Sequence, residues 1–412
     1  MNIYLVIIIC ILIFQYVLNF LIAHLNVKSA SSILPLEFEG YYDVDKYKKS
    51  QEYLKENTRF HEVESTVSLV FMLPFIFLGG FNYFDVWARG FGFGEILTGL
   101  IFAGTLMLCS QILSFPFSVY HIFVIEEKYG FNKTTIKIFV ADIIKGLILG
   151  AIMGGGVFAG IIWFFQKMGD AAWIYSWMGI VLFQLVITFI APVVIMPLFN
   201  KFIPMEEGEV KTAIDAYAKE QDFKLQGIYK MDGSKRSTKS NAFFTGFGKF
   251  RRIVLFDTLI EKHTVDELVS VLAHEIGHYK KKHILQTMLI SVFTTGLMFY
   301  CLSFFINNVD LFEAFGMQDV SIYGSLLFFG FLYAPINMVL SIFYNVFSRK
   351  NEYEADVFAV NTYHRAESMI NALKKLTVDN LSNLTPHALN VFINYSHPPV
   401  LKRIEAIRKI ND

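Results

Sequence analysis

Charged residues are scarce in this sequence. Only 17% of its 412 residues are Asp, Glu, Lys or Arg, whereas these four types make up about a quarter of a typical soluble chain. Apolar residues make up 54% of the sequence, and 43 positions are Phe, which is more than one globular core can bury. The composition therefore excludes an ordinary soluble protein of this length, and we expect the apolar excess to face lipid.

The net charge is zero and cysteines are few. The 36 basic residues balance the 36 acidic residues, and no basic run with interleaved aromatic residues occurs, so we expect no nucleic-acid partner. The three cysteines, Cys10, Cys109 and Cys301, are odd in number, and each lies in an apolar stretch, where a thiol behaves as a small hydrophobe. We therefore expect no disulfide framework.

Seven apolar runs are long enough to cross a membrane, which requires roughly 20 helical residues. The first run lacks a basic segment before it and a clean small-residue cleavage site after it, so we interpret it as an uncleaved span. The predicted fold is a predominantly α-helical polytopic membrane protein with seven transmembrane helices. The runs are Ile3 to Ala23, Ser65 to Phe84, Ile96 to Ile125, Ile138 to Phe165, Trp173 to Phe199, Ile284 to Ile306 and Val320 to Phe347.

Basic residues concentrate in alternate connecting segments. Of the 36 Lys and Arg residues, 33 lie on one side of the predicted membrane, whereas the other side holds only Arg89 and Lys167. Because Lys and Arg favour cytoplasmic loops, we predict that the N-terminus lies outside and the C-terminus inside. The basic segments are residues 24–64, 126–137, 200–283 and 348–412.

Charged residues and glycines inside the fourth span are unusual. Asp142 and Lys145 lie three residues apart, so we expect them to pair with each other. The pair indicates either a water-filled interior or a position near the interface, since a charge at mid-membrane costs about 2.5 to 3.5 kcal/mol. Gly146, Gly150 and Gly154 follow at four-residue spacing, which predicts close packing of helix backbones.

Two polar regions lie on the predicted cytosolic side, and we interpret them as one small domain split around the last two spans. In the first region, Asn241 to Thr245 and Arg251 to Phe256 are β-prone runs separated by Gly246, Phe247 and Gly248, which predicts a hairpin. The predicted division is a membrane region of residues 1–203, a first polar part of residues 204–283, spans six and seven within residues 284–347, and a second polar part of residues 348–412.

A helix in the first polar region carries a metal-binding pattern. Thr264 to Glu267 match a capping box, which predicts that a helix begins there. On it, His274 and His278 lie four residues apart, so their imidazoles share a face and suit two corners of a zinc site. Glu275 can take a proton from a metal-bound water. A pair of surface histidines is the alternative interpretation.

The tail supplies candidates for the third protein ligand that a catalytic zinc requires. Ser348 is predicted to begin a second helical stretch, on which Glu352 and Asp356 share a face. We expect Glu352 to bind zinc and Asp356 to accept a hydrogen bond from a ligand histidine. Glu354 projects elsewhere and is the weaker ligand candidate. A solvated charged face is the alternative.

One histidine outside this pattern is a candidate for catalysis. Most of the others lie in polar segments without a partner at ligand spacing, and His283 is interpreted as a neighbour of His278 on the same helix. His397 differs because two prolines follow it and fix the backbone of a turn before a closing helix with Arg403. A positioned His or Arg can stabilise an oxyanion, so we predict catalytic roles for both residues.

These motifs together resemble the type I CAAX prenyl protease family, which are integral membrane zinc metalloproteases that cleave isoprenylated C-terminal motifs. The resemblance covers almost the whole chain, although Tyr129 and Glu354 stand where relatives often carry other residues. The motifs that carry it are Glu126 to Lys133, Ser240 to Gly246, Arg252 to Leu259, His274 to His278, Glu352 to Asp356, and His397 to Pro399 with Arg403.

The resemblance implies seven helices that enclose a water-filled chamber, closed at its cytosolic end by a small α+β zinc domain of the gluzincin type. Asn241 and Ala242 would lie on an edge strand, where an extended peptide can pair with the backbone. The other implied roles are Zn²⁺ ligation by His274, His278 and Glu352, general base catalysis by Glu275, support of a ligand by Asp356, and assistance to the substrate or transition state by His397 and Arg403.

We therefore expect a zinc-dependent membrane endopeptidase that cleaves near the C-terminus of prenylated CAAX-type substrates, in contact with membrane lipid. It would reside in the endoplasmic reticulum membrane of a eukaryote or the inner membrane of a bacterium. In the hypothesised reaction, zinc polarises the scissile carbonyl, while Glu275 removes a proton from water and passes it to the leaving amine. Two alternatives stay open: a membrane quality-control protease of the heat-shock class with unprenylated substrates, and a transporter or structural protein with a vestigial zinc site.

Overall fold

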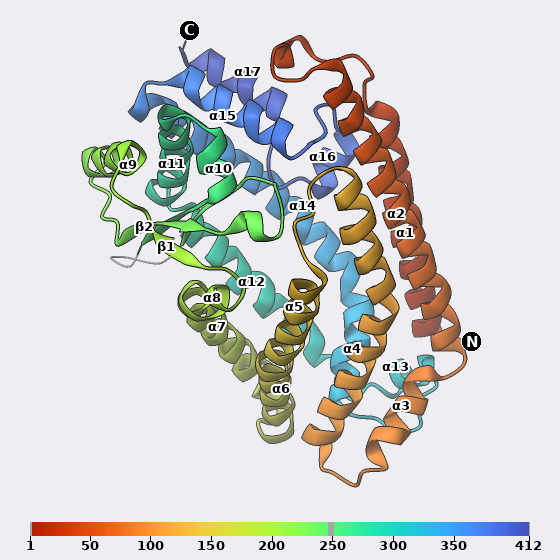
Figure 1. Cartoon of the computed structure of the whole chain (residues 1–412). Helices are drawn as coiled ribbons and strands as arrows, with labels where there is room; N and C mark the ends of the chain where they lie inside the picture. Colours follow the sequence, from red (N-terminus) through yellow and green to blue (C-terminus); the bar gives the residue numbers. More distant parts are fainter. Residues whose placement is uncertain (1, 246–250, 412) are drawn as a thin grey trace.

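Helices dominate the computed structural model, which describes residues 2–245 and 251–411 (Figure 1). Within these residues, seven helical segments are long and apolar enough to cross a membrane. This confirms the seven spans predicted from the sequence, although several ends differ. The segments are Ile3–Ser29, Val44–Phe77, Glu95–Glu126, Ile136–Lys167, Gly169–Phe199, His283–Ser303 and Ile322–Tyr363.

Two of these helices extend well beyond the predicted spans. The second, α2 (Val44–Phe77), begins where Asp43 caps it, upstream of the predicted start at Ser65. The seventh, α14 (Ile322–Tyr363), is a single helix of 42 residues. The predicted start of a second helix at Ser348 is therefore wrong, because no Gly or Pro interrupts α14 after Pro335. The two carboxylates predicted near the metal are thus carried on the polar extension of a membrane helix.

The expected pairing in the fourth segment is wrong. Asp142 does not pair with Lys145; it accepts two hydrogen bonds from Arg236, at 2.7 and 2.9 Å. The Lys145 ammonium instead donates to the carbonyl oxygen of Leu198 at 2.7 Å. Since Arg236 belongs to the polar region, Asp142 lies where the fourth segment meets that region.

The expected close packing at the three glycines is also wrong. A Cβ added at Gly146 or Gly154 would meet no atom within 4 Å, and one added at Gly150 would meet only the end of Met107, at 3.9 Å. The chain forms a π-helical turn at Gly150–Gly154 instead. Four-residue glycine spacing brings helices together only where a second backbone lies against that face, and the nearest atom found at these three glycines is the end of the Met107 side chain.

A small mixed sheet forms the base of the polar region, in the order β1-β2-β4-β3. β2 and β4 run parallel, whereas β3 pairs antiparallel with β4, with Ala242 opposite Leu255. This confirms the predicted hairpin and the expected edge strand, while Gly246, Phe247 and Gly248 lie outside the described residues. The strands are β1 (Phe202–Pro204), β2 (Gly227–Met231), β3 (Ala242–Thr245) and β4 (Arg252–Phe256).

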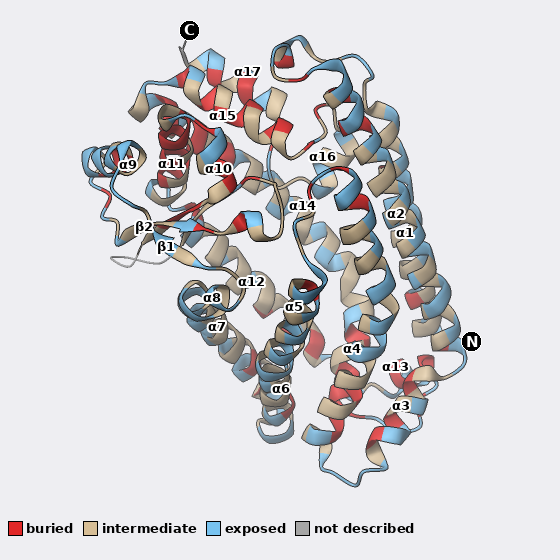
Figure 2. Ribbon diagram, viewed as in Figure 1, coloured by how far each residue is buried: buried red, intermediate tan, exposed pale blue. Residues whose placement is uncertain are grey.

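Helices pack on the sheet and on one another at this end of the molecule (Figure 1). α11 (Val265–Lys280) is central, because Leu268, Leu272 and Ile276 on its inner face are at most 1% exposed. Figure 2 shows buried residues gathered along α11 and α15, whereas the spanning helices are largely intermediate or exposed. The other helices of this region are α9 (Glu209–Glu220), α10 (Asp257–Lys262), α15 (Ala366–Asp379), α16 (Ala388–Asn394) and α17 (Val400–Asn411).

Few residues in the most apolar parts of the spanning helices are buried. Between 0 and 17% of the most apolar window of each segment is buried, which suits helices that face lipid. The remaining helices are α1 (Ile3–Ser29), α3 (Gly80–Arg89), α4 (Glu95–Tyr120), α5 (Ile136–Leu149), α6 (Gly155–Lys167), α7 (Ala172–Ile190), α8 (Met196–Phe199), α12 (His283–Ser303) and α13 (Val309–Ala314), with short helical turns at Leu36–Phe38, His121–Glu126, Gly169–Ala171, Ala191–Ile195 and Gly233–Lys235.

Candidate metal centre

The two histidines of the predicted motif lie one turn apart on α11. The helix begins with the predicted capping box, in which the backbone N–H of Thr264 donates to the carboxylate of Glu267 at 2.9 Å. The Nε2 atoms of His274 and His278 are 3.1 Å apart. The capped helix therefore presents both imidazoles to one point.

A carboxylate from α14 completes this group. Glu352 Oε2 lies 3.4 Å from His274 Nε2, and Glu352 Oε1 lies 3.2 Å from His278 Nε2. Within the described residues, these three side chains are the group whose ligand atoms all lie within 4.8 Å of one another. The structure therefore brings together the three residues that the sequence predicted as zinc ligands.

Small residues let the two helices approach closely enough for this contact. A Cβ added at Gly277 would lie 3.1 Å from the Cα and the carbonyl oxygen of Ala355. Ala355 itself is fully buried. Gly277 lies between the two histidines of the motif, and Ala355 lies between Glu352 and Asp356, so the closest approach of the helices occurs at the site.

The chemistry of this group fits a zinc ion. Glu352 is 4% exposed, and its Oε2 atom has no hydrogen-bond partner among the described residues. A buried carboxylate oxygen without a partner is costly, and a bound metal ion removes that cost. Two imidazole nitrogens and one carboxylate oxygen, with a fourth position open, are a donor set typical of catalytic zinc.

A buried ion pair of Asp356 and Arg403 contacts His274 at Nδ1, the ring nitrogen away from the ligand group. Asp356 Oδ1 lies 2.8 Å from His274 Nδ1, which fixes the tautomer that directs Nε2 at the metal. Burial by itself would lower the pKa of His274, but the carboxylates of Asp356 and Glu352 outweigh it and raise the pKa to about 9. Arg403 donates to both oxygens of Asp356, at 2.6 and 2.8 Å.

The two catalytic candidates of the tail lie near different oxygens of Glu352. Arg403 is buried, and its Nη1 atom lies 3.4 Å from Glu352 Oε2. The His397 side chain is 65% exposed, and its Nε2 atom lies 3.3 Å from Glu352 Oε1. His397 is therefore accessible to a substrate, whereas the guanidinium of Arg403 is occupied by Asp356.

The other predicted site residues lie on α11 and at the sheet edge. Glu275 is partly exposed and has no hydrogen bond to any side chain that the structure describes. Ala242 begins the edge strand β3, and its N–H donates to the side-chain oxygen of Asn241 at 2.9 Å. The backbone oxygen of Asn241 accepts from Phe256 on β4 at 3.1 Å. Both residues thus lie at the edge where we predicted substrate pairing.

His283 was not predicted to contribute to the site, and Glu354 was predicted only as a weaker ligand candidate. His283 is not on the same helix as His278, as the sequence suggested, because Lys282 adopts a left-handed conformation (φ 60) and α12 begins at His283. His283 Nδ1 lies 3.0 Å from His278 Nδ1, and His283 Nε2 lies 3.2 Å from Glu354 Oε2. No Gly marks this break, so the sequence carries no signal for it.

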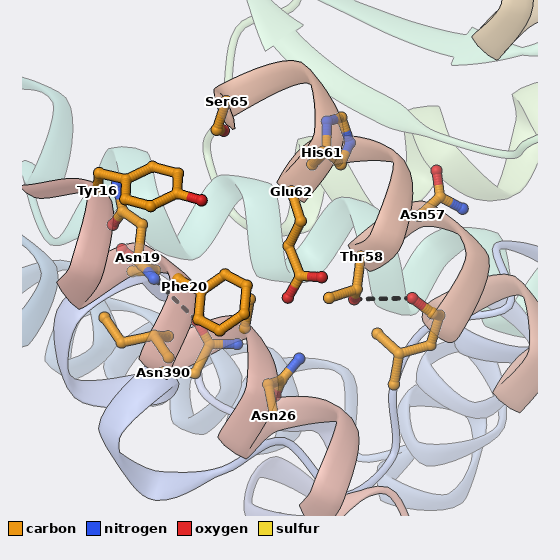
Figure 3. Close-up of a pocket in the computed structure, with 14 residues that line it drawn as sticks. Tyr16, Asn19, Phe20, Asn26, Asn57, Thr58, His61, Glu62, Ser65 and Asn390 are labelled. Atoms are coloured by element: carbon orange, nitrogen blue, oxygen red, sulfur yellow. Dashed lines mark hydrogen bonds between the residues drawn. The ribbon is translucent and has the colours of Figure 1, made fainter. Parts of the chain in front are cut away.

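A separate cavity of about 420 Å³ lies between α1, α2 and α16 (Figure 3). Its lining combines asparagine side chains with aromatic rings, and Glu62 and Thr58 also face it. No metal-centre residue lines it, so this cavity places polar groups between the first two spans, apart from the centre. The asparagines are Asn19, Asn26, Asn57, Asn390 and Asn394, and the rings are Tyr16 and Phe20.

Known proteins are similar to this chain over nearly its whole length. The family described as CAAX prenyl protease N-terminal, five membrane helices, matches residues 23–201. Peptidase family M48 matches residues 204–411. Both parts of the chain thus have relatives of known type.

Individual relatives cover the chain almost end to end. The CAAX prenyl protease 1 homolog of Oryza sativa is 35% identical over 98% of this chain and 97% of its own. The Homo sapiens homolog of the same name is 34% identical over 91% of this chain and 88% of its own. The crystal structure of S. mikatae Ste24p matches with a TM-score of 0.93 and 31% identity, over 98% of this chain and 99% of that one.

Proposed function

Because this chain belongs to peptidase family M48, and is therefore a membrane-embedded metalloendopeptidase, we propose that it cleaves prenylated CAAX-type substrates near their C-terminus, using zinc bound by His274, His278 and Glu352. The observation that carries this proposal is the convergence of these three side chains, in which a buried carboxylate oxygen of Glu352 has no hydrogen-bond partner among the described residues. The relatives named CAAX prenyl protease 1 support the substrate class.

The residues around the ligands suit hydrolysis of a peptide bond. Zinc, when bound, would act as a Lewis acid toward the scissile carbonyl and the attacking water. Glu275 accepts a proton from that water and returns it to the leaving amine nitrogen. Its carboxylate is free for this role, because Glu275 is next to the ligand His274 in the sequence and has no hydrogen bond to a described side chain. His397, exposed beside Glu352, can donate to the oxyanion.

Arg403 has a different part in this proposal from the direct catalytic role predicted for it. Its buried guanidinium binds both oxygens of Asp356, which in turn bonds His274. Arg403 therefore acts on the substrate only through the carboxylates that it holds in place. We assign it as a positioning residue that keeps Asp356 ionised and oriented.

The substrate would bind as an extended peptide along β3, with Asn241 and Ala242 at the end of that edge strand. The low burial of the spanning helices supports a water-filled chamber for the lipidated part. The basic-residue distribution supports a cytosolic position for the split catalytic domain of residues 204–283 and 348–412, in the endoplasmic reticulum or an inner membrane.

The decisive experiment compares a farnesylated CAAX peptide with its unprenylated twin, using detergent-purified protein and its Glu275→Gln variant. We expect cleavage of the lipidated peptide to exceed that of the twin. Loss of general base catalysis predicts that Glu275→Gln lowers kcat by about 10²- to 10⁴-fold, while zinc content stays at the wild-type level.

Two outcomes would contradict the proposal. Equal cleavage of both peptides would favour a quality-control protease that acts on unprenylated substrates. Wild-type activity in Glu275→Gln would remove Glu275 from its role as the base.

A further inference from the structure

A chain of three side chains runs outward from the metal centre behind His278. The Nδ1 atom of His278, on the ring edge away from the ligand group, lies 3.0 Å from His283 Nδ1. The opposite nitrogen of His283 lies 3.2 Å from Glu354 Oε2. His283 is 3% exposed, whereas the Glu354 side chain is 39% exposed. The chain thus joins a half-buried ligand to a carboxylate at the surface.

Proton positions along this chain follow from the ligand role of His278. An imidazole that offers its Nε2 lone pair to a metal carries its proton on Nδ1. His283 Nδ1 must then be the acceptor, which places the proton of a neutral His283 on Nε2. That N–H points at Glu354, a carboxylate that can only accept. One arrangement of protons therefore satisfies every nitrogen in the chain.

The two ligand histidines are held in different ways. His274 bonds directly to a carboxylate, the fully buried Asp356. His278 reaches its carboxylate only through His283. The intervening residue is fixed because it is the first residue of the spanning helix α12, immediately after the left-handed Lys282.

We propose that His283 and Glu354 are positioning residues that orient His278 and set how tightly the site holds zinc. The inference rests on the zinc site proposed above. Outer partners of ligand histidines typically change metal affinity by about 10- to 100-fold when they are removed. Glu354 was predicted as the weaker ligand candidate, and in this arrangement it serves the site without touching the metal.

The test measures zinc affinity by chelator competition on the purified full chain, without substrate. We expect His283→Ala to raise the Kd for zinc about 10- to 100-fold. His283→Asn should recover most of that loss, because its amide oxygen can accept from His278 Nδ1. Glu354→Ala should weaken binding less, and Glu354→Gln less again, since an amide oxygen still accepts from His283.

The double variant His283→Ala/Glu354→Ala distinguishes a relay from two separate effects. If the chain acts as a unit, Glu354→Ala adds nothing once His283 is absent. The absorption of the Co²⁺-loaded protein should also change in His283→Ala. His263→Ala is the matched control, since His263 is buried as well but its ring faces the Leu259 carbonyl on α10, and we expect wild-type affinity and spectrum.

Each remaining outcome would overturn the inference. A wild-type Kd in His283→Ala, or a full additional loss from Glu354→Ala in that background, would show that no relay exists. Should His283→Ala fail to fold, the surface variants Glu354→Ala and Glu354→Gln carry the test, and equal wild-type affinities in both would contradict the relay. A wild-type protein that binds no zinc would instead refute the proposed function itself.

Discussion

Glycine at position 277 permits the close contact of two helices at the metal centre. The ligand His278 follows it directly. The backbone of Ala355 on α14 lies so close that a Cβ atom at position 277 would be 3.1 Å from it. A pattern of two histidines and a glutamate predicts the ligands from helix periodicity alone. It cannot reveal this contact, because the contact depends on a helix that begins 45 residues later in the sequence, at Ile322.

The first prediction concerns this glycine. Gly277→Ala should push α14 away from α11, because its Cβ would lie 3.1 Å from backbone atoms that cannot yield as a flexible side chain does. We expect a stability loss of about 1 to 3 kcal/mol, with a higher Kd for zinc. Gly154→Ala, where a Cβ meets nothing within 4 Å, is the control. Thermal unfolding and chelator competition measure both, and unchanged values in Gly277→Ala would contradict the argument.

A second prediction concerns the buried pair behind His274. Asp356→Asn removes the carboxylate charge nearest to Arg403, and among the described residues it leaves the buried guanidinium paired only with Glu352, at 3.4 Å. Removing one partner of a buried pair costs about 3 to 5 kcal/mol, and we expect weaker zinc binding as well. The double variant Asp356→Asn/Arg403→Met should recover part of the stability. If the double variant is less stable than the single one, the ion pair is not the cause.

Elements with local sequence signals could be predicted from the sequence, whereas two helix boundaries could not. The capping box at Thr264 and the β-prone runs of the hairpin are local signals, and the structure contains both the helix and the strand pair. The break between α11 and α12 depends on a left-handed Lys282, which no propensity indicates. The predicted break at Ser348 is wrong because the composition changes there from apolar to polar while the helix continues.

A third prediction follows from the continuity of α14. Proline is tolerated in the first turn of a helix but costs about 3 kcal/mol or more in the interior. Ser348→Pro should therefore kink α14 between its membrane part and Glu352, lowering the melting temperature and abolishing zinc binding. Ser348→Ala is the control and should bind zinc as the wild type does. Retained zinc binding in Ser348→Pro would show that the ligand-bearing end of α14 folds independently of its membrane part.

At the scale of the whole molecule, the two ends of the chain share one core. Residues between α1 and α2 appeared in the sequence only as a basic connecting segment. In the structure, Phe38 from this segment and Tyr47 from the first turn of α2 are at most 3% exposed, and they pack in one cluster with Ile404 and Ile407 of α17. Aromatic residues in an irregular segment have no periodicity, so the sequence could not predict that the N-terminal segment supports the helix of Arg403.

Glu37 provides the polar part of this contact. It lies in the turn at Leu36–Phe38, and its carboxylate bonds Lys374 of α15 at 2.6 Å and Arg408 of α17 at 2.6 and 2.7 Å. Its side chain is 20% exposed, so solvent screens these pairs only in part. Burial would raise the pKa of Glu37, but the two cations outweigh it and lower the pKa below its usual range.

The last prediction is the pH dependence of this contact. Since the pKa of Glu37 is lower in the folded protein, its stabilisation is present above the pKa of the unfolded chain, about 4.3, and is lost as the pH falls through the folded value. We expect Glu37→Gln to cost about 1 to 2 kcal/mol at pH 7, and the difference from wild type to shrink below pH 4. Glu39→Gln, at an exposed residue without an ion pair to the described residues, is the control. A difference between wild type and Glu37→Gln that stays constant across this pH range would mean that the Glu37 charge does not join the ends of the chain.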